Sequence, residues 1–141
     1  MEAGRDTSKP IPATLASLLA GIDWNKTGKQ NQGKIVLKVI EDGFFTQPDR
    51  HLPRLSQVGN NLEYLIGGYV FNLNALRCKD LTDGMMLGRR IAKKYEEFYR
   101  KYVPGCENIE LVVTASLMGI RESRRIVGEY ELTFEDYLSR R

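Results

Sequence analysis

The sequence has few of the side chains that build metal and redox centres. Its 141 residues include one histidine, His51, and two widely separated cysteines, Cys78 and Cys106. Zinc fingers and ribbons need several histidines or cysteines in close spacing, and iron–sulfur clusters are usually held by four cysteines. The chain by itself therefore supplies no metal or iron–sulfur site. We expect both thiols to be reduced and structural.

Long apolar runs are also absent. No segment approaches the ~18–20 apolar residues of a bilayer-spanning helix, so the sequence predicts no transmembrane helix. Met1–Pro10 is polar and carries charges of both signs, unlike a secretory signal peptide. These absences predict a cytoplasmic protein with no membrane partner.

Glycine is common, with 13 residues, but no two glycines are spaced as G-x-G. The sequence thus lacks G-x-G-x-x-G, the motif in which a glycine turn lets the backbone approach a pyrophosphate. Residues 28–34 match the start of a phosphate-binding Walker A loop. Ile35 takes the next position, where Ser or Thr must bind magnesium, so we interpret this stretch as a polar surface turn.

The remaining composition is that of an ordinary globular chain. Hydrophobic residues make up 42%, charged residues 28%, and the net charge is +3. This length and composition fit one domain, and the positive charge is too small and too well mixed with acidic residues to indicate nucleic-acid binding. We expect an irregular tail over residues 1–12 and a single domain over residues 13–141.

The clearest predicted element is a long amphipathic helix over Thr82–Tyr102. Its apolar side chains recur every three or four positions, and Asp80 or Thr82 is expected to cap its start. A shorter apolar stripe predicts a helix over residues 34–42. The spacing of a capping box predicts a final short helix over residues 134–138.

Strands are predicted where β-branched and aromatic residues gather. These segments are Tyr69–Leu73, Glu110–Thr114 and, as a further candidate, Ile126–Leu132. Ala13–Ile22 is apolar throughout and fits either a buried strand or a short helix. The predicted fold class is therefore mixed α/β (α+β), a small sheet with one long amphipathic helix packed on it.

The densest cluster of functional side chains lies between Gly119 and Gly128, where arginines occupy positions 121, 124 and 125. Guanidinium groups bind carboxylates and phosphates through two parallel hydrogen bonds. If this stretch is extended, Arg121, Ser123 and Arg125 share one face, and Arg124 points to the other. Anion recognition is one interpretation. The other is a solvated turn in which Glu122 pairs with an arginine.

A second candidate cluster is Asp49-Arg50-His51. His51 can transfer a proton near neutral pH, with Asp49 fixing its tautomer. The alternative is a hydrogen-bonded surface histidine in an ordered loop. Asp23-Trp24 follows a candidate strand, where the carboxylate either contacts a ligand or caps a turn beside a packed Trp24.

Three stretches, residues 13–24, 43–53 and 114–130, together resemble the FAD-dependent oxidoreductase family, which is usually grouped with the flavoprotein component of heterodisulfide reductase. Residues 119–130 (GIRESRRIVGEY) are the most specific part of the likeness, which extends over nearly everything from Pro12 to Arg141. In that family the matching stretch is the middle of a longer chain. It comprises the substrate-side region and the return into the FAD domain.

The resemblance implies FAD as cofactor and an oxidoreductase function, but the dinucleotide-binding motif is missing from this sequence. It thus implies a fragment that does not retain FAD alone and that acts with an FAD-domain polypeptide or as a homo-oligomer, on a small-molecule substrate. The implied cofactor-binding residues are Gly119, Arg121 and Arg125, the implied catalytic residues are Arg121, Arg125 and His51, and the implied substrate contacts are Asp49, Arg50 and His51. The alternatives are a non-catalytic module with an anion-binding arginine turn, or an inert truncated fragment.

Overall fold

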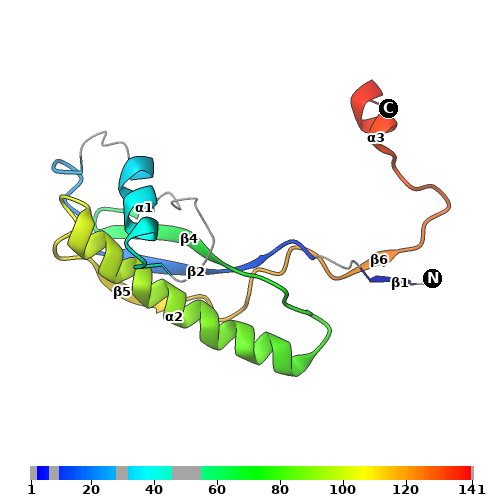
Figure 1. Ribbon diagram of the computed structural model, residues 1–141, viewed down its shortest axis with the longest axis horizontal. Helices are drawn as coiled ribbons and strands as arrows, with labels where there is room; N and C mark the ends of the chain where they lie inside the picture. The colour runs from blue at the N-terminus through cyan, green and yellow to red at the C-terminus, as the bar shows by residue number, and fades with distance from the viewer. Residues whose placement is uncertain (1–2, 7–9, 28–31, 46–54, 141) are drawn as a thin grey trace.

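A four-stranded antiparallel sheet with two helices forms the body of the molecule. The computed structural model describes residues 3–6, 10–27, 32–45 and 55–140. The strand order is β3-β4-β2-β5 (Figure 1). The strands are β2 (Ala13–Ala20), β3 (Leu55–Gly59), β4 (Leu62–Val70) and β5 (Glu110–Thr114). Helix α1 (Gln32–Glu41) joins β2 to β3, and α2 (Cys78–Tyr102) joins β4 to β5, so each helix connects two strands that flank a third. This β-α-β-β-α-β order is the split βαβ arrangement, and it confirms the predicted mixed α/β class.

The long predicted helix is present as α2, but it begins one turn earlier, at Cys78. Arg77 precedes it without a side-chain cap, so neither Asp80 nor Thr82 is the N-cap. The Thr82 hydroxyl instead donates to the Cys78 carbonyl within the helix, at 3.0 Å. The predicted apolar stripe is buried against the sheet, with Phe98 and Tyr99 fully enclosed.

Close contact between α2 and the sheet depends on glycine. Gly68 in β4 has φ of 76°, and a Cβ atom there would lie 2.0 Å from Cγ2 of Ile91 in α2. A Cβ at Gly88 would lie 2.8 Å from that of Leu15. Because glycine alone avoids both clashes, the helix backbone lies directly on β2 and β4.

Two strands differ from their predicted bounds. Ala13–Ile22, which fitted strand or helix, is a strand to Ala20. The strand predicted at Tyr69–Leu73 ends at Val70 and extends back to Leu62. Gly67-Gly68, which looks like a break in the sequence, accommodates a bulge between β2 and β4, and Asn72 at φ 56° turns the chain out of the sheet.

The two faces of the sheet have different surroundings. Leu15, Ser17 and Leu19 of β2 are buried beneath the helices, and the alternating residues Ala16, Leu18 and Ala20 are only partly buried. In the register of the sheet, Leu18 lies beside Tyr64 and Val113, and Ala16 beside Ile66. We call this helix-free side the open face. Its larger apolar members are Leu18, Tyr64, Ile66 and Val113.

Helix α1 closes one end of the covered face. It ends at Glu41, close to the predicted bound, and Gly43 follows with φ of 73° and an N–H that donates to the Ile40 carbonyl at 3.0 Å. Phe44 and Phe45 follow and pack edge-on to each other, and Phe45 contacts Phe98 at a ring separation of 5.2 Å. None of the helices described is both long and apolar enough to cross a lipid bilayer.

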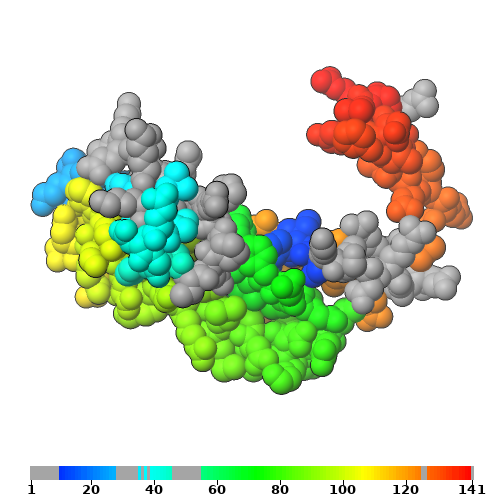
Figure 2. Space-filling view, viewed as in Figure 1, coloured from blue at the N-terminus to red at the C-terminus, as the bar shows by residue number. Residues whose placement is uncertain are grey.

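The N-terminal strand β1 (Ala3–Asp6) pairs with β6 (Arg124–Ile126) beyond the sheet, while the chain continues past β6 to a C-terminus at α3 (Phe134–Ser139) (Figure 1). β1 lies within the segment expected to be irregular and runs antiparallel to β6. Of the candidate strand at 126–132, only Ile126 lies in a β-strand. A C-terminal arm, residues 127–140, continues to α3, which has the predicted capping box and no buried residue. Figure 2 shows this arm standing away from the body.

Candidate functional site

Arg121 lies at the end of the open face nearest the β1–β6 ribbon. Its guanidinium carbon is 5.6 Å from the centre of the Tyr69 ring, and the Tyr69 and Phe71 rings meet edge to face at 6.0 Å. Tyr69 pairs with Thr14 across β4 and β2. Within the described part of the chain, Arg121 forms no ion pair or hydrogen bond, so its N–H groups are available to a ligand.

The residues on both sides of Arg121 are held by β2 and by the segment that precedes it. Gly119 donates to the Thr14 carbonyl at 2.8 Å and accepts from the Thr14 N–H at 3.3 Å. After Arg121, the Glu122 carboxylate accepts from the N–H of Ile11 at 3.1 Å. These contacts hold the intervening residues in place, so the position of Arg121 over Tyr69 is set by the fold.

The other predicted residues of this cluster are placed less fully. The Gly119 N–H, expected to contact the cofactor, bonds to Thr14 in this conformation, and a Cβ at Gly119 would lie 3.0 Å from the Thr14 oxygen. Close approach of two backbones thus explains this glycine. Arg125 pairs with Arg5 in the ribbon, but its side chain lies outside what the structure describes. Its predicted role stays a prediction.

The second predicted cluster cannot be located. Asp49, Arg50 and His51 lie outside the described residues, between Phe45 and Leu55. Their predicted roles in proton transfer and substrate contact stay predictions.

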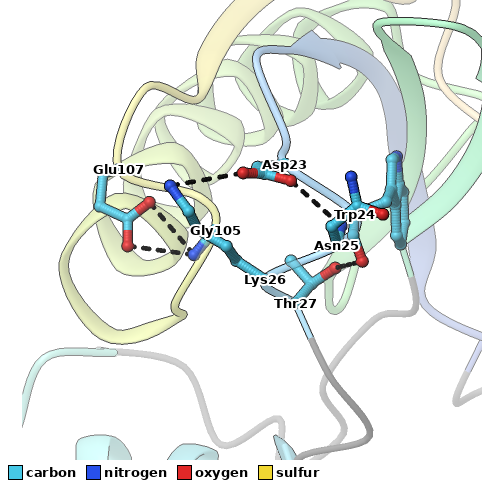
Figure 3. A network of polar contacts seen from close by, with 7 residues as sticks. All are labelled: Asp23, Trp24, Asn25, Lys26, Thr27, Gly105 and Glu107. Atoms are coloured by element: carbon cyan, nitrogen blue, oxygen red, sulfur yellow. Dashed lines mark hydrogen bonds and ion pairs between the residues drawn. The ribbon is translucent and has the colours of Figure 1, made fainter.

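Asp23 and Trp24 lie at the opposite end of β2, in a turn held by residues after α2 (Figure 3). The Asp23 carboxylate accepts from the Asn25 N–H at 3.1 Å and lies 3.4 Å from the Lys26 amine. The backbone N–H of Asp23 donates to the Gly105 carbonyl. The Gly105 N–H in turn donates to the Glu107 carboxylate, which lowers the pKa of Glu107. Asp23 therefore caps a turn, one of its two interpretations.

Sequence reasoning missed a buried carboxyl group at this end. Glu63 of β4 is 0% exposed, and its Oε1 accepts from the Trp24 indole N–H at 3.3 Å. Its Oε2 has no hydrogen-bond partner among the described residues. Burial raises the pKa of Glu63, and the Trp24 hydrogen bond opposes that shift. The available signal was period-two alternation, which places Glu63 on the same covered face as Leu65.

A second buried carboxylate, Glu96 of α2, is fully paired. It accepts from Lys93 at 2.7 Å and from Arg100, which also donates to the Ile109 carbonyl. Burial opposes its ionisation, but the two cations lower the pKa of Glu96 overall. Cys106 is also enclosed, and burial raises its pKa to about 12, in keeping with a structural thiol. Glu96 and Cys106 therefore stabilise the fold.

The described residues do not form a cradle for a dinucleotide. At two left-handed glycines the space is filled by protein: a Cβ at Gly21 would lie 2.2 Å from the Asn108 oxygen, and one at Gly105 would lie 2.6 Å from the Asp23 oxygen. Gly43 has open space around it but stands alone at the end of α1. A cleft where β4 meets α2 measures about 190 Å³, below the ~300–1,000 Å³ of typical ligand pockets. Asp80 and Asp83 line it and would repel phosphates. In the described ranges, no three metal-binding side chains converge.

Comparison with known proteins gives one match. No curated protein and no solved structure is similar to this chain. The family model described as FAD dependent oxidoreductase matches residues 9–141, which include the sheet, both helices of the body, Arg121 and the C-terminal arm. The chain therefore belongs to the FAD dependent oxidoreductase family.

Proposed function

We propose that this chain is the substrate-side part of a flavoprotein oxidoreductase. Its open face lies against an FAD-binding domain, and Arg121 lies beside the substrate. The observation that carries the proposal is an apolar sheet face, free of helices and bordered by Arg121 and Tyr69, in a member of this family. Such a face is costly to leave in water.

The composition of the open face supports a protein partner. Ile66 and Val113 are 47% and 52% exposed, and Leu18 and Tyr64 lie beside them in the register. Full burial of a side chain of this size is worth roughly 1.5–3 kcal/mol, and Ile66 and Val113 are already about half buried. Covering each of them therefore adds about half of that value to the binding of a partner domain.

The edges of the sheet favour contact through its face. Each edge strand has a bulge with one extra, exposed valine: Val58 in β3 and Val112 in β5. Bulges interrupt the regular row of hydrogen-bonding groups that an added strand would use. A partner domain accordingly binds across the open face and does not extend the sheet.

The pairing of β1 with β6 supports a place for this chain within a larger assembly. β1 and β6 run side by side, so the chain enters and leaves the body at one end, close to Arg121. Two adjacent connections of this kind suit a domain inserted into, or paired with, an FAD-binding domain. Arg121 then lies near the junction between the two.

FAD, when bound, supplies the electron-accepting ring of such an enzyme, and its dinucleotide is held outside the residues that the structure describes. The narrower likeness to the flavoprotein component of heterodisulfide reductase remains part of the proposal, supported by residues 119–130. We expect the chain alone to be colourless and not to retain FAD.

The test is association with an FAD-loaded domain from a longer member of the family, one that has the G-x-G-x-x-G motif. Sedimentation should show a complex with the flavin absorbance co-migrating. Ile66→Asp should weaken this complex at least tenfold, because it buries a charge at the centre of the face. Val58→Asp, at the bulged edge, is the matched control and should leave binding unchanged.

Two results would contradict the proposal. Tight binding of FAD by the chain alone would place the cofactor site within these residues. If the chain forms no complex with that domain but forms a homodimer that Ile66→Asp dissociates, the open face joins two copies of this chain. In that case the alternative of a non-catalytic anion-binding module gains support.

A further inference from the structure

We infer that Arg121 and Tyr69 form the binding site for a carboxylate group of the substrate. This inference rests on the proposed function and adds the chemical class of the ligand. It begins from the geometry of one side chain, an arginine fixed on an aromatic ring and unpaired within the described chain.

The contact with Tyr69 leaves the N–H groups of Arg121 without a hydrogen-bond partner among the described residues. The guanidinium carbon lies 5.6 Å from the centre of the ring, within the range of a cation–π contact. A guanidinium has five N–H donors, so donors remain available to a ligand. A carboxylate with two oxygens matches two parallel N–H groups of a guanidinium.

The site is held in place before any ligand arrives. Gly119 and Thr14 form two backbone hydrogen bonds, and Glu122 binds the Ile11 N–H on the other side of Arg121. The ring beneath is fixed as well, because Tyr69 pairs with Thr14 in the sheet. Such pre-organisation lowers the entropy lost on binding.

A carboxylate suits this site better than a phosphate. Phosphates and pyrophosphates are usually bound by clusters of free backbone N–H groups at glycine turns or helix starts. Here the nearby Gly119 N–H already bonds to Thr14. Among the described side chains, Arg121 supplies one positive charge to this site, which balances one carboxylate.

The surroundings indicate what the carboxylate is attached to. Tyr69 and Phe71 pack together beside Arg121, and Phe71 is partly exposed. The ligand is therefore an organic acid with an apolar or aromatic portion, which lies on Tyr69 and Phe71 with its charge at Arg121.

The experiment is an NMR titration of the arginine Nε–H signals of the whole chain with sodium benzoate, and separately with pyrophosphate. We expect benzoate to shift the Arg121 signal and the Tyr69 ring signals in a saturable way. Arg121→Gln should abolish the Tyr69 shift, and Arg121→Lys should weaken binding about tenfold, because lysine keeps the charge without the planar fork. Arg89→Gln, on the exposed side of α2, is the control and should bind as the parent does.

Unshifted backbone spectra elsewhere will show that each variant is folded. Stronger binding of pyrophosphate than of benzoate through Arg121 would overturn the carboxylate assignment and favour a flavin phosphate. Equal benzoate binding by parent and Arg121→Gln would overturn the site itself. If the chain binds benzoate through Arg121 but does not associate with an FAD-binding domain, the carboxylate site stands and the proposed function is wrong. If the chain associates with that domain but does not bind benzoate, the proposed function stands and the carboxylate site is wrong.

Discussion

The two faces of the sheet are built from the same strands, yet they have different tasks. On the covered face Phe98 and Tyr99 are completely enclosed, and Gly68 is required by the approach of α2. On the open face Ile66 and Val113 are about half exposed, although they are equally apolar. Apolar side chains left this exposed fit the proposed contact with an FAD-binding domain.

The largest expected effect separates the faces directly. Phe98→Ala on the covered face should lower the free energy of unfolding by about 3–5 kcal/mol, because it opens a cavity among packed rings. Ile66→Ala on the open face should lower it by less than ~1 kcal/mol, because a half-exposed side chain leaves no enclosed cavity. Urea unfolding followed by circular dichroism measures both. Equal losses would show that the open face is also part of the core.

The next effect tests close contact on the covered face. Gly68→Ala should cost roughly 2–4 kcal/mol, since it adds a clash with Ile91 to the strain of a left-handed backbone. Gly43→Ala is the matched control: its φ is similar, at 73°, but its Cβ would meet nothing within 4 Å. It should cost about 1–2 kcal/mol, from strain alone. A smaller loss at Gly68 than at Gly43 would contradict the tight packing of α2.

Periodicity predicts most of the covered face. The helix stripe leading to Tyr102, the strand at Glu110–Thr114 and the capping box at Thr133 are all confirmed. The errors arise where a local signal misleads. Thr82 resembles an N-cap but lies inside α2, and Gly67-Gly68 resembles a break but forms a bulge within β4.

The candidate site is less predictable from sequence. The cluster of arginines singles out Arg121, but the ring beneath it, Tyr69, is distant in the sequence and is brought near only by strand pairing. The expected role of Gly119 did not allow for its hydrogen bonds with Thr14. Glu63 escaped notice because one acidic residue between apolar neighbours gives no motif, only a position in an alternating pattern.

A smaller effect concerns Glu63, the polar exception on the covered face. Its pKa is raised by burial, so the folded state prefers the protonated carboxyl. Stability is then complete at acid pH, below the ordinary glutamate pKa, and is lost as the pH rises through the raised value. Glu63→Gln, which can still accept from Trp24, should remove this loss and be more stable than the parent at pH 8 by roughly 1 kcal/mol.

The difference in unfolding free energy between the parent and Glu63→Gln, measured in urea at pH 5 and pH 8, isolates the contribution of the Glu63 carboxyl. Glu107→Gln, compared with the parent at pH 3 and pH 6, provides a control of opposite sign. The pKa of Glu107 is lowered by hydrogen bonds from the backbone, so its contribution is present above the ordinary pKa and disappears as the pH falls. A parent and Glu63→Gln with parallel pH profiles would show that the buried carboxyl is already paired.

The smallest expected effect on global stability lies in the C-terminal arm. In α3 the Thr133 hydroxyl accepts from the Asp136 N–H at 3.2 Å, and the Asp136 carboxylate accepts from the Thr133 N–H at 2.9 Å and from the Tyr130 hydroxyl. Thr133→Ala removes a cap that is typically worth ~0.5–2 kcal/mol to its own helix. Because α3 has no buried residue, the free energy of global unfolding should stay within ~0.3 kcal/mol of the parent, while the amide protons of residues 134–138 exchange faster with solvent. A loss of global unfolding free energy close to that of Phe98→Ala would mean that the arm packs on the body as part of one core. The arm would then belong with the covered face, and only the open face of the sheet would differ from it.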